Sequence, residues 1–223
     1  MARPFHSEAQ IEENRRRLCT AALALYRDQG YDAVTLRELG AVSGVSHATP
    51  YRYFASKDEL FAQVRALVFT AFGEHLQARD TRRGDPLSRL RRIVLGFVDF
   101  AAQWPEDYRL IFSMRQPPTP KGSPLAEARR RTIEHVTGVC QEAIDAGLIR
   151  GDASTQVHLA WASLHGLLSL HVSNHLVHGR QLQDLVAPMI DRLFAPVAVA
   201  DGRRPQLPAR TRTPLRSRIR TKK

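Results

Sequence analysis

The sequence predicts an all-α fold of about nine helices, and two observations lead to it. Apolar residues recur at intervals of three and four, as in the stripe Leu87, Leu90, Val94, Phe97 and Ala101, and no segment shows the alternation of a half-buried strand. Hydrophobic residues make up 43% of the 223 positions, which is enough to bury a core and excludes wholesale disorder. A small N-terminal domain followed by a larger C-terminal helical domain is the expected organisation.

The N-terminal part predicts three helices. The first follows an apolar stripe that begins at Ile11 and ends at Gly30. A second, short helix follows Thr35, whose hydroxyl suits an N-cap. Ser46 then caps a third helix, expected from His47 to about Phe54.

A tight turn joins the second and third of these helices. Gly44 is free to adopt a positive φ there, and Gly40 permits the two helices to approach closely. Val45 and Tyr53 are expected to pack the pair together. Two short helices joined by a glycine-containing turn are typical of the helix-turn-helix, in which the second helix enters the major groove of DNA.

Further helices are expected in the remainder of the chain. Apolar stripes predict one over 60–72, one over 87–101 and one over 133–143. A short helix should follow Pro105 as far as Met114, since proline suits the first turn.

The last two helices are more apolar. Asp152 is the expected N-cap of a long helix that reaches about His178 and is buried on most sides. A final helix over 182–193 should kink or break at Pro188, because proline lacks the backbone N–H.

The charge of the chain is concentrated at its C-terminal end. The formal net charge is +11, and nine arginines and lysines stand against Asp201 alone in the last part of the sequence. We therefore expect a flexible arm over 1–10, the helix-turn-helix domain over 11–58, a ligand-binding and dimerisation domain over 59–196, and a disordered basic tail over 197–223.

Cysteine usage and apolar runs bear on location. Cys19 and Cys140 lack metal-type spacing, and free thiols in a reducing cytosol are the natural interpretation. The first ten residues have no signal-peptide core, and no apolar run is long enough to span a membrane. A cytoplasmic protein without a membrane partner is expected.

A longer pattern extends around the helix-turn-helix, from about residue 14 to residue 64. Its residues are Ala21, Ala22, Tyr26, Gly30, Tyr31, Val34, Thr35, Leu39, Gly44, Val45, Ser46, Tyr51, Tyr53, Phe54, Ser56, Lys57 and Leu60. In this order they resemble the tetracycline-repressor (TetR) family. Two positions depart from the family pattern: Gly40 stands where alanine is usual, and Pro50 lies early in the expected recognition helix.

The resemblance implies a homodimer on double-stranded, palindromic operator DNA. Thr35, Tyr51 and Lys57 are then expected to contact phosphates. A second group is expected to meet base edges or nearby phosphates: Ser46, His47, Thr49 and Arg52. For Arg52 the alternative is a solvated charge.

The C-terminal half carries a second resemblance. The run from Trp161 to Gly166 is similar to the WHG signature of one class of TetR-like C-terminal domains, and 105–112 fits the same class. The resemblance implies a four-helix dimer interface and a mostly apolar pocket for a small-molecule effector. Core packing is an equal alternative for each candidate lining residue, and these are Phe97, Trp104, Tyr108, Phe112, Trp161 and His165.

The function expected is that of a sequence-specific transcriptional regulator, a repressor released from its operator by a small, largely apolar ligand. The alternative is a constitutive or nonspecific DNA-binding protein driven by the basic tail. No enzyme is expected, since no phosphate loop, nucleophile elbow or HExxH motif is present, and no cofactor is implied. His171, His175 and His178 fall at i, i+4 and i+7 on one face of the long helix, which permits a metal site, but no cysteine or carboxylate motif adjoins them except the remote Asp184.

Overall fold

The computed structural model describes residues 7–114 and 116–195. These residues form eight α-helices, one 3₁₀ turn and one π-helical turn, and they contain no β-strand. The all-α prediction is therefore confirmed. None of the helices in the described ranges is both long enough and apolar enough to cross a bilayer.

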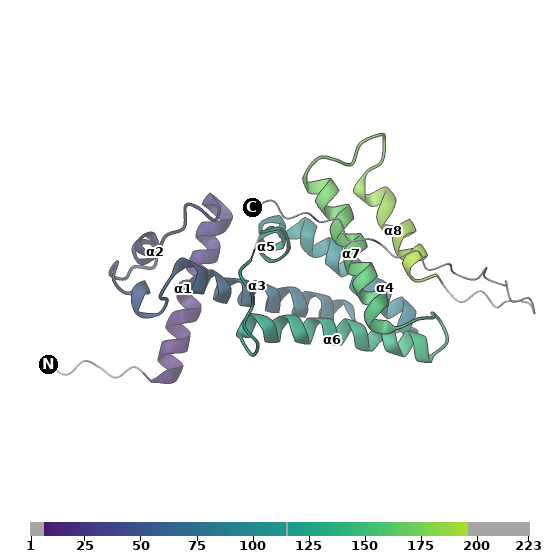
Figure 1. Cartoon of the computed structure of the whole chain (residues 1–223), viewed down its shortest axis with the longest axis horizontal. Helices are drawn as coiled ribbons and strands as arrows, with labels where there is room; N and C mark the ends of the chain where they lie inside the picture. Colours follow the sequence, from purple (N-terminus) through teal and green to yellow (C-terminus); the bar gives the residue numbers. More distant parts are fainter. Residues whose placement is uncertain (1–6, 115, 196–223) are drawn as a thin grey trace, which may run out of the picture.

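The N-terminal unit lies at one end of the molecule (Figure 1). It consists of α1 (Glu8–Gln29), α2 (Leu36–Val42) and the 3₁₀ turn η1 (Pro50–Arg52). The next helix, α3 (Lys57–Arg79), runs from this unit into the larger group of helices. The core of the unit joins α1 to the start of α3, because the Tyr26 and Phe61 rings meet edge to face with centroids 6.1 Å apart.

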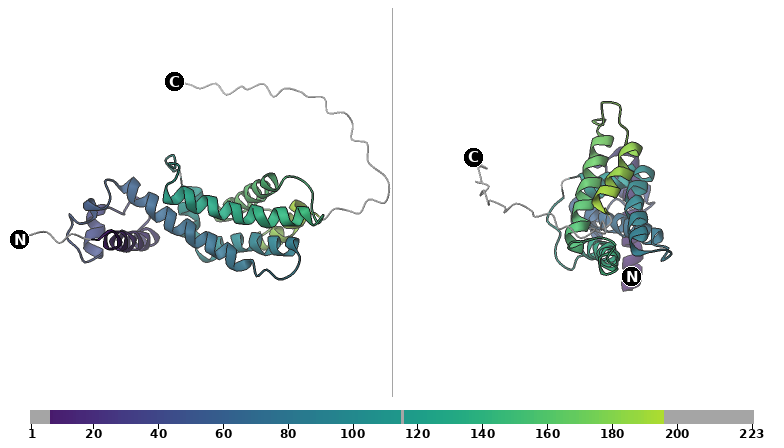
Figure 2. Two further views of the ribbon diagram at one scale, coloured as in Figure 1. Left: turned by 90° about the horizontal axis from the view of Figure 1, so that it is seen from below. Right: turned by 90° about the vertical axis from the view of Figure 1, so that its right-hand side faces the viewer.

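The larger group contains the remaining helices. They are α4 (Pro86–Gln103), α5 (Pro105–Tyr108), the π-helical turn η2 (Arg109–Ser113), α6 (Pro124–Asp145), α7 (Ala153–Val172) and α8 (Leu182–Leu193). Figure 2 shows α3 and α6 side by side along the length of this group. Gly73 permits that approach, because a Cβ at this position would lie 2.5 Å from Thr132 Oγ1 on α6.

Most helices begin at a side chain that accepts a hydrogen bond from the first turn. The capping residues, each a serine, threonine or aspartate, are Ser7, Thr35, Ser56, Asp85, Ser123 and Asp152. Caps of this type satisfy backbone N–H groups that have no partner within the helix. The predicted N-caps Thr35 and Asp152 are confirmed, and α1 begins at Glu8, three residues before the expected start.

The prediction of a regular helix from His47 to Phe54 is wrong. The chain forms turns after Ser46 and then the 3₁₀ turn η1, in which the Arg52 and Tyr53 N–H groups bond to carbonyls three residues earlier. Pro50 explains this outcome, because it cannot donate the hydrogen bond that a helix would need at this point. The expected packing of Val45 is also wrong, since this side chain is 37% exposed.

The long C-terminal helix ends earlier than predicted. Its last residue is Val172, because Asn174 adopts a left-handed φ of 55° and the His175 N–H closes back on the Leu170 carbonyl. By contrast, α8 continues through Pro188, so the predicted break does not occur. Residues 1–6 of the predicted arm and the whole predicted basic tail, 197–223, lie outside the described residues.

Candidate DNA-binding surface and ligand cavity

The seven candidate DNA-contacting residues all belong to the segment from α2 to the start of α3. Thr35, Ser46, His47, Tyr51 and Arg52 are exposed, whereas Thr49 and Lys57 are partly buried. Tyr51 is 58% exposed, and such a large exposed aromatic ring at a turn is available to a partner. These seven residues therefore lie in one segment of the chain, and five of them are exposed.

The turn that carries them is held against α2 by backbone contacts. A Cβ on Gly40 would lie 2.9 Å from His47 Cα and 3.0 Å from the Ser46 carbonyl oxygen, so only glycine fits there without a shift. The His47 ring bonds through Nδ1 to the Arg37 carbonyl at 3.0 Å. The predicted positive φ of Gly44 is confirmed at 66°.

Two side chains of α1 that sequence reasoning missed hold the far end of this segment. Asn14 donates to the Tyr53 hydroxyl at 3.1 Å, and Arg15 donates to the Tyr53 carbonyl at 3.0 Å. Tyr53 is only 9% exposed, which fits a packing role. Both polar residues lie on the side of α1 that faces the turn, and no sequence signal separated them from their solvated neighbours.

Lys57, the first residue of α3, is positioned by two contacts. Its ammonium lies over the Tyr31 ring, 4.2 Å from the centroid, and donates to the Asp32 carbonyl at 3.2 Å. The Tyr31 hydroxyl in turn donates to Asp58 at 3.1 Å. The side chain therefore presents a positive charge beside a helix N-terminus, where backbone N–H groups also favour anions.

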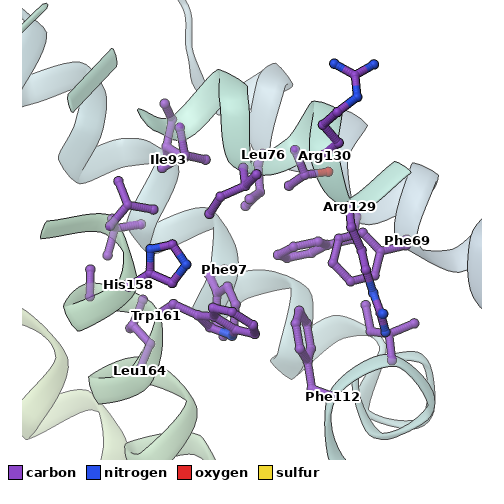
Figure 3. Close-up of a pocket in the computed structure, with 18 of the residues that line it drawn as sticks. Phe69, Leu76, Ile93, Phe97, Phe112, Arg129, Arg130, His158, Trp161 and Leu164 are labelled. Atoms are coloured by element: carbon purple, nitrogen blue, oxygen red, sulfur yellow. The ribbon is translucent and has the colours of Figure 1, made fainter. Parts of the chain in front are cut away.

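The larger helical group encloses a cavity of about 710 Å³ among α3, α4, α6 and α7. Figure 3 shows aromatic side chains around it, among them Phe69, Phe97, Phe112 and Trp161. The full lining is Phe69, Phe72, Leu76, Leu90, Ile93, Val94, Phe97, Ile111, Phe112, Thr119, Ala126, Arg129, Arg130, Thr132, Ile133, Val136, Val157, His158, Ala160, Trp161, Leu164 and Phe194. A cavity of this size and character is typical of small-molecule sites.

The structure places three of the six candidate ligand residues on this lining, namely Phe97, Phe112 and Trp161. Tyr108 and His165 instead pair with each other behind the wall, with the hydroxyl 2.6 Å from His165 Nδ1. Burial lowers the pKa of His165 and raises that of Tyr108, so it favours the neutral form of both groups. Trp104 packs outside the cavity against Phe100.

Sequence reasoning missed the residues that α3 and α6 contribute. Phe69, Phe72 and Leu76 lie three and four positions apart, so the helical spacing was visible although the cavity was not. Two arginines, Arg129 and Arg130, also line this wall. The sequence did not indicate this, because both belong to a run of three arginines that is typical of a solvated face.

The cavity wall is linked to the N-terminal unit through α5. Arg27 at the end of α1 donates two hydrogen bonds, 2.8 and 2.6 Å long, to the Asp107 carboxylate, whose side chain is 6% exposed. The Tyr26 hydroxyl donates to the Glu106 carbonyl at 3.1 Å. Because η2, which carries Ile111 and Phe112, follows α5 directly, the contacts join the cavity wall to the DNA-binding unit.

The three histidines and the two cysteines show no arrangement of a metal site or a reactive thiol within the described residues. His171 lies on α7 while His175 and His178 lie in the following loop, so the expected common face is absent, and no metal-type cluster occurs within 7–114 and 116–195. Cys19 and Cys140 are free and buried, and burial raises their pKa values to about 12 and about 11. High pKa values disfavour the reactive thiolate.

A helix-turn-helix unit joined to a helical domain around an apolar cavity defines the class of helix-turn-helix transcriptional regulators. Sequence comparison gives the family. Residues 18–64 match "Bacterial regulatory proteins, tetR family", and residues 90–193 match "Tetracyclin repressor-like, C-terminal domain". The chain belongs to the TetR family of DNA-binding transcriptional regulators, which are not enzymes.

Curated relatives agree with this assignment. The transcriptional activator FasR of Mycolicibacterium smegmatis is 30% identical over 165 residues, which cover 73% of this chain and 71% of FasR. The regulator AcrR of Shigella flexneri is 35% identical over 100 residues, which cover 44% of this chain and 46% of AcrR. The repressor KstR of M. smegmatis is 34% identical over 88 residues, which cover 40% of this chain and 43% of KstR.

Solved structures share the fold. A Rhodococcus sp. RHA1 protein of unknown function has a TM-score of 0.70 at 24% identity, and the match covers 87% of this chain and 98% of that one. The fatty acid degradation regulator FadR of Bacillus halodurans has a TM-score of 0.61 at 15% identity, and the match covers 81% and 94%.

Proposed function

We propose that this protein is a homodimeric repressor that binds a palindromic operator and is released by a small, largely apolar ligand. The observation that carries the proposal is the continuous link from the cavity to the DNA-binding unit through Asp107 and Arg27. A ligand that displaces η2 also displaces α5, and so it changes the contact that orients α1. For this to regulate DNA binding, the ligand must bind the two conformations with different affinity.

The turn from Ser46 to Arg52 is proposed to enter the major groove of DNA. Ser46, His47, Thr49 and Arg52 would meet base edges or nearby phosphates, and their exposure and position on one turn support this role. Thr35, Tyr51 and Lys57 would contact phosphates, supported by the positions of Thr35 and Lys57 at the starts of α2 and α3.

The dimer is proposed to form through α7 and α8. The outer face of α7 presents Leu159 and Leu170, which are 51% and 45% exposed, with the small residues Ala162 and Gly166 between them. Exposed leucines on one helix face favour a partner surface, and small residues allow its helices to approach. Paired subunits would place their turns about 34 Å apart, one turn of the DNA helix. We also propose that the C-terminal domain belongs to the WHG class. In support, the histidine of this signature, His165, forms a hydrogen bond with Tyr108 inside the domain.

Fluorescence anisotropy on the protein's own upstream intergenic DNA, against a scrambled duplex of equal length, tests the proposal. We expect preference for the natural duplex, and loss of that preference in Tyr51→Ala, whose exposed ring can be removed without disturbing the core. The matched control is Tyr31→Phe, which keeps an aromatic ring under Lys57.

The opposite outcome is equally specific. Equal, salt-sensitive binding to both duplexes, unchanged by Tyr51→Ala and lost on truncation after residue 196, would establish nonspecific binding by the basic tail instead. The dimer is tested separately by sedimentation equilibrium. Leu170→Glu should yield monomers that lose operator affinity, and a dimeric Leu170→Glu protein would place the interface elsewhere.

A further inference from the structure

The side chain of Arg129 distinguishes the cavity from an ordinary apolar core. Arg129 on α6 lines it, with the guanidinium over the Phe69 ring, 5.6 Å from the centroid. The guanidinium donates to Thr119 Oγ1 at 2.8 Å and to Gln116 Oε1 at 2.5 Å, and both acceptors are neutral. Among the residues that the structure describes, no carboxylate forms an ion pair with Arg129.

The surroundings of this charge are unfavourable to it. Burial lowers the pKa of Arg129, and the positive charge of Arg65 lowers it further. Arg65 is only 3% exposed, and it has no ion pair within the described ranges either. Because a desolvated cation without a counter-charge is costly, this end of the cavity favours an anion.

The neighbouring arginine provides the contrast. Arg130 forms ion pairs with Glu127 and Glu134, each with an N–O distance of 2.7 Å. Figure 3 shows its side chain directed away from the cavity, whereas Arg129 extends along the wall beside Phe69 and Phe112. The charge of Arg130 is therefore compensated by carboxylates of the protein, whereas the charge of Arg129 has no such partner among the described residues.

We propose that the cavity binds a small molecule with an apolar body and one anionic group, and that this group, a carboxylate or a group of similar geometry, accepts hydrogen bonds from Arg129. The inference rests on the proposed function, which assigns the cavity to a ligand. The aromatic walls would hold the apolar body. The planar guanidinium matches a carboxylate with two parallel hydrogen bonds, which neutral acceptors on a loop do not supply.

The anionic group would take the place of Thr119 and Gln116 as acceptor. Gln116 also donates through Nε2 to the Ile111 carbonyl at 2.8 Å, so it connects Arg129 to η2. Release of Gln116 from Arg129 therefore acts on the turn that follows α5 and its contact with α1. The charged group of the ligand would thus reach the same element as its apolar body.

Tryptophan fluorescence can report on this cavity selectively. The chain has two tryptophans, of which Trp161 lines the cavity and Trp104 does not. In a Trp104→Phe protein the emission comes from Trp161 alone. Titration with decanoate and with n-decanol then compares two probes of equal chain length, of which only decanoate is charged at about pH 8.

We expect saturable binding of decanoate with an affinity about ten- to hundredfold above that of n-decanol, the range for one charged hydrogen-bonded pair. Arg129→Gln should remove the preference. Arg131→Gln, which changes an exposed arginine of the same helix that does not line the cavity, should keep it as the matched control. Far-UV circular dichroism verifies the fold of each variant. Should Arg129→Gln fail to fold, Arg129→Lys keeps the charge, loses the planar fork and should show a reduced preference.

Equal affinities for the two probes in the Trp104→Phe protein would overturn the proposal that the ligand carries an anionic group, and the cavity would then be a site for apolar ligands. Absence of saturable binding by both probes would overturn the inference as well. An unchanged preference in a folded Arg129→Gln protein would overturn the role of Arg129, because the anionic group would then bind to another residue. The operator assay with Tyr51→Ala judges the proposed DNA-binding function independently, because it involves no ligand.

Discussion

Replacing Gly40 with alanine has two opposing effects on the stability of the fold. Alanine is favoured over glycine inside a helix by about 1 kcal/mol, which would stabilise α2. The added Cβ, however, would lie 2.9 Å from His47 Cα and 3.0 Å from the Ser46 carbonyl oxygen. Both neighbours are backbone atoms, so they can yield only if the whole turn moves. Overpacking of this kind costs about 1 to 3 kcal/mol, and the balance is a net loss of up to about 2 kcal/mol.

The exposed glycine of α6, Gly138, supplies a matched control. A Cβ there would meet no atom within 4 Å, so Gly138→Ala should gain the helix-propensity term without a clash. For a chain of this length we expect its melting temperature to rise by about 2 to 4 °C. Gly40→Ala should instead melt at the same or a lower temperature.

Thermal melts followed by circular dichroism, with anisotropy on the upstream duplex, measure both consequences. Because the displaced turn carries Ser46, His47 and Thr49, operator affinity should fall in Gly40→Ala and stay unchanged in Gly138→Ala. If Gly40→Ala rises in melting temperature as much as Gly138→Ala and keeps its operator affinity, the close approach of the turn to α2 is refuted.

Three further predictions concern packing and charge. Arg27→Met should destabilise the fold by about 1 to 2 kcal/mol, a discounted value because Arg27 is 46% exposed, and the loss should be less than additive with Asp107→Leu in urea unfolding; strictly additive losses would contradict the pairing. Hydrogen bonds from Arg89 lower the pKa of Asp80 from 3.8 to about 2. The stability that this pair adds to the fold is therefore complete above pH 3.8 and is lost as the pH falls through about 2. Asp80→Asn should therefore lower the unfolding free energy at neutral pH by about 2 kcal/mol and weaken its acid dependence, and an unchanged acid dependence would count against this assignment. Gly73→Ala should cost about 1 to 3 kcal/mol in the same assay, and Thr132→Ala should restore part of the loss by removing the hydroxyl 2.5 Å from the new Cβ; no restoration would show that the hydroxyl is not the obstacle.

Local signals in the sequence predicted much of the fold. Thr35 and Asp152 act as caps because capping depends on a residue and its next three neighbours. The end of α7 could not be predicted in this way. Asn174 competes with an apolar pattern that continues to Leu176, and only the packed structure decides that the left-handed turn prevails.

The recognition segment shows the same limit. Pro50 revealed a missing donor, but whether the chain continues as a helix or tightens into a 3₁₀ turn depends on its contacts with α2. The cavity depends on still longer-range information. Aromatic residues are visible in the sequence, yet the rotation of each helix determines that Phe112 faces the cavity while Tyr108 bonds to His165 behind it. For the same reason Arg129 was indistinguishable from Arg130.

Trp161 connects the cavity to the helix proposed for the dimer. It lines the cavity, it stands on α7, and its side chain is 43% exposed in the single subunit. When one side chain contributes to two binding events, each event changes the free energy of the other by the same amount. Ligand affinity should then vary with protein concentration, because dilution separates the subunits and alters the cavity wall. The number of copies in a cell would thereby set the ligand concentration to which the regulator responds, so a regulator that controls its own synthesis would also adjust its own sensitivity.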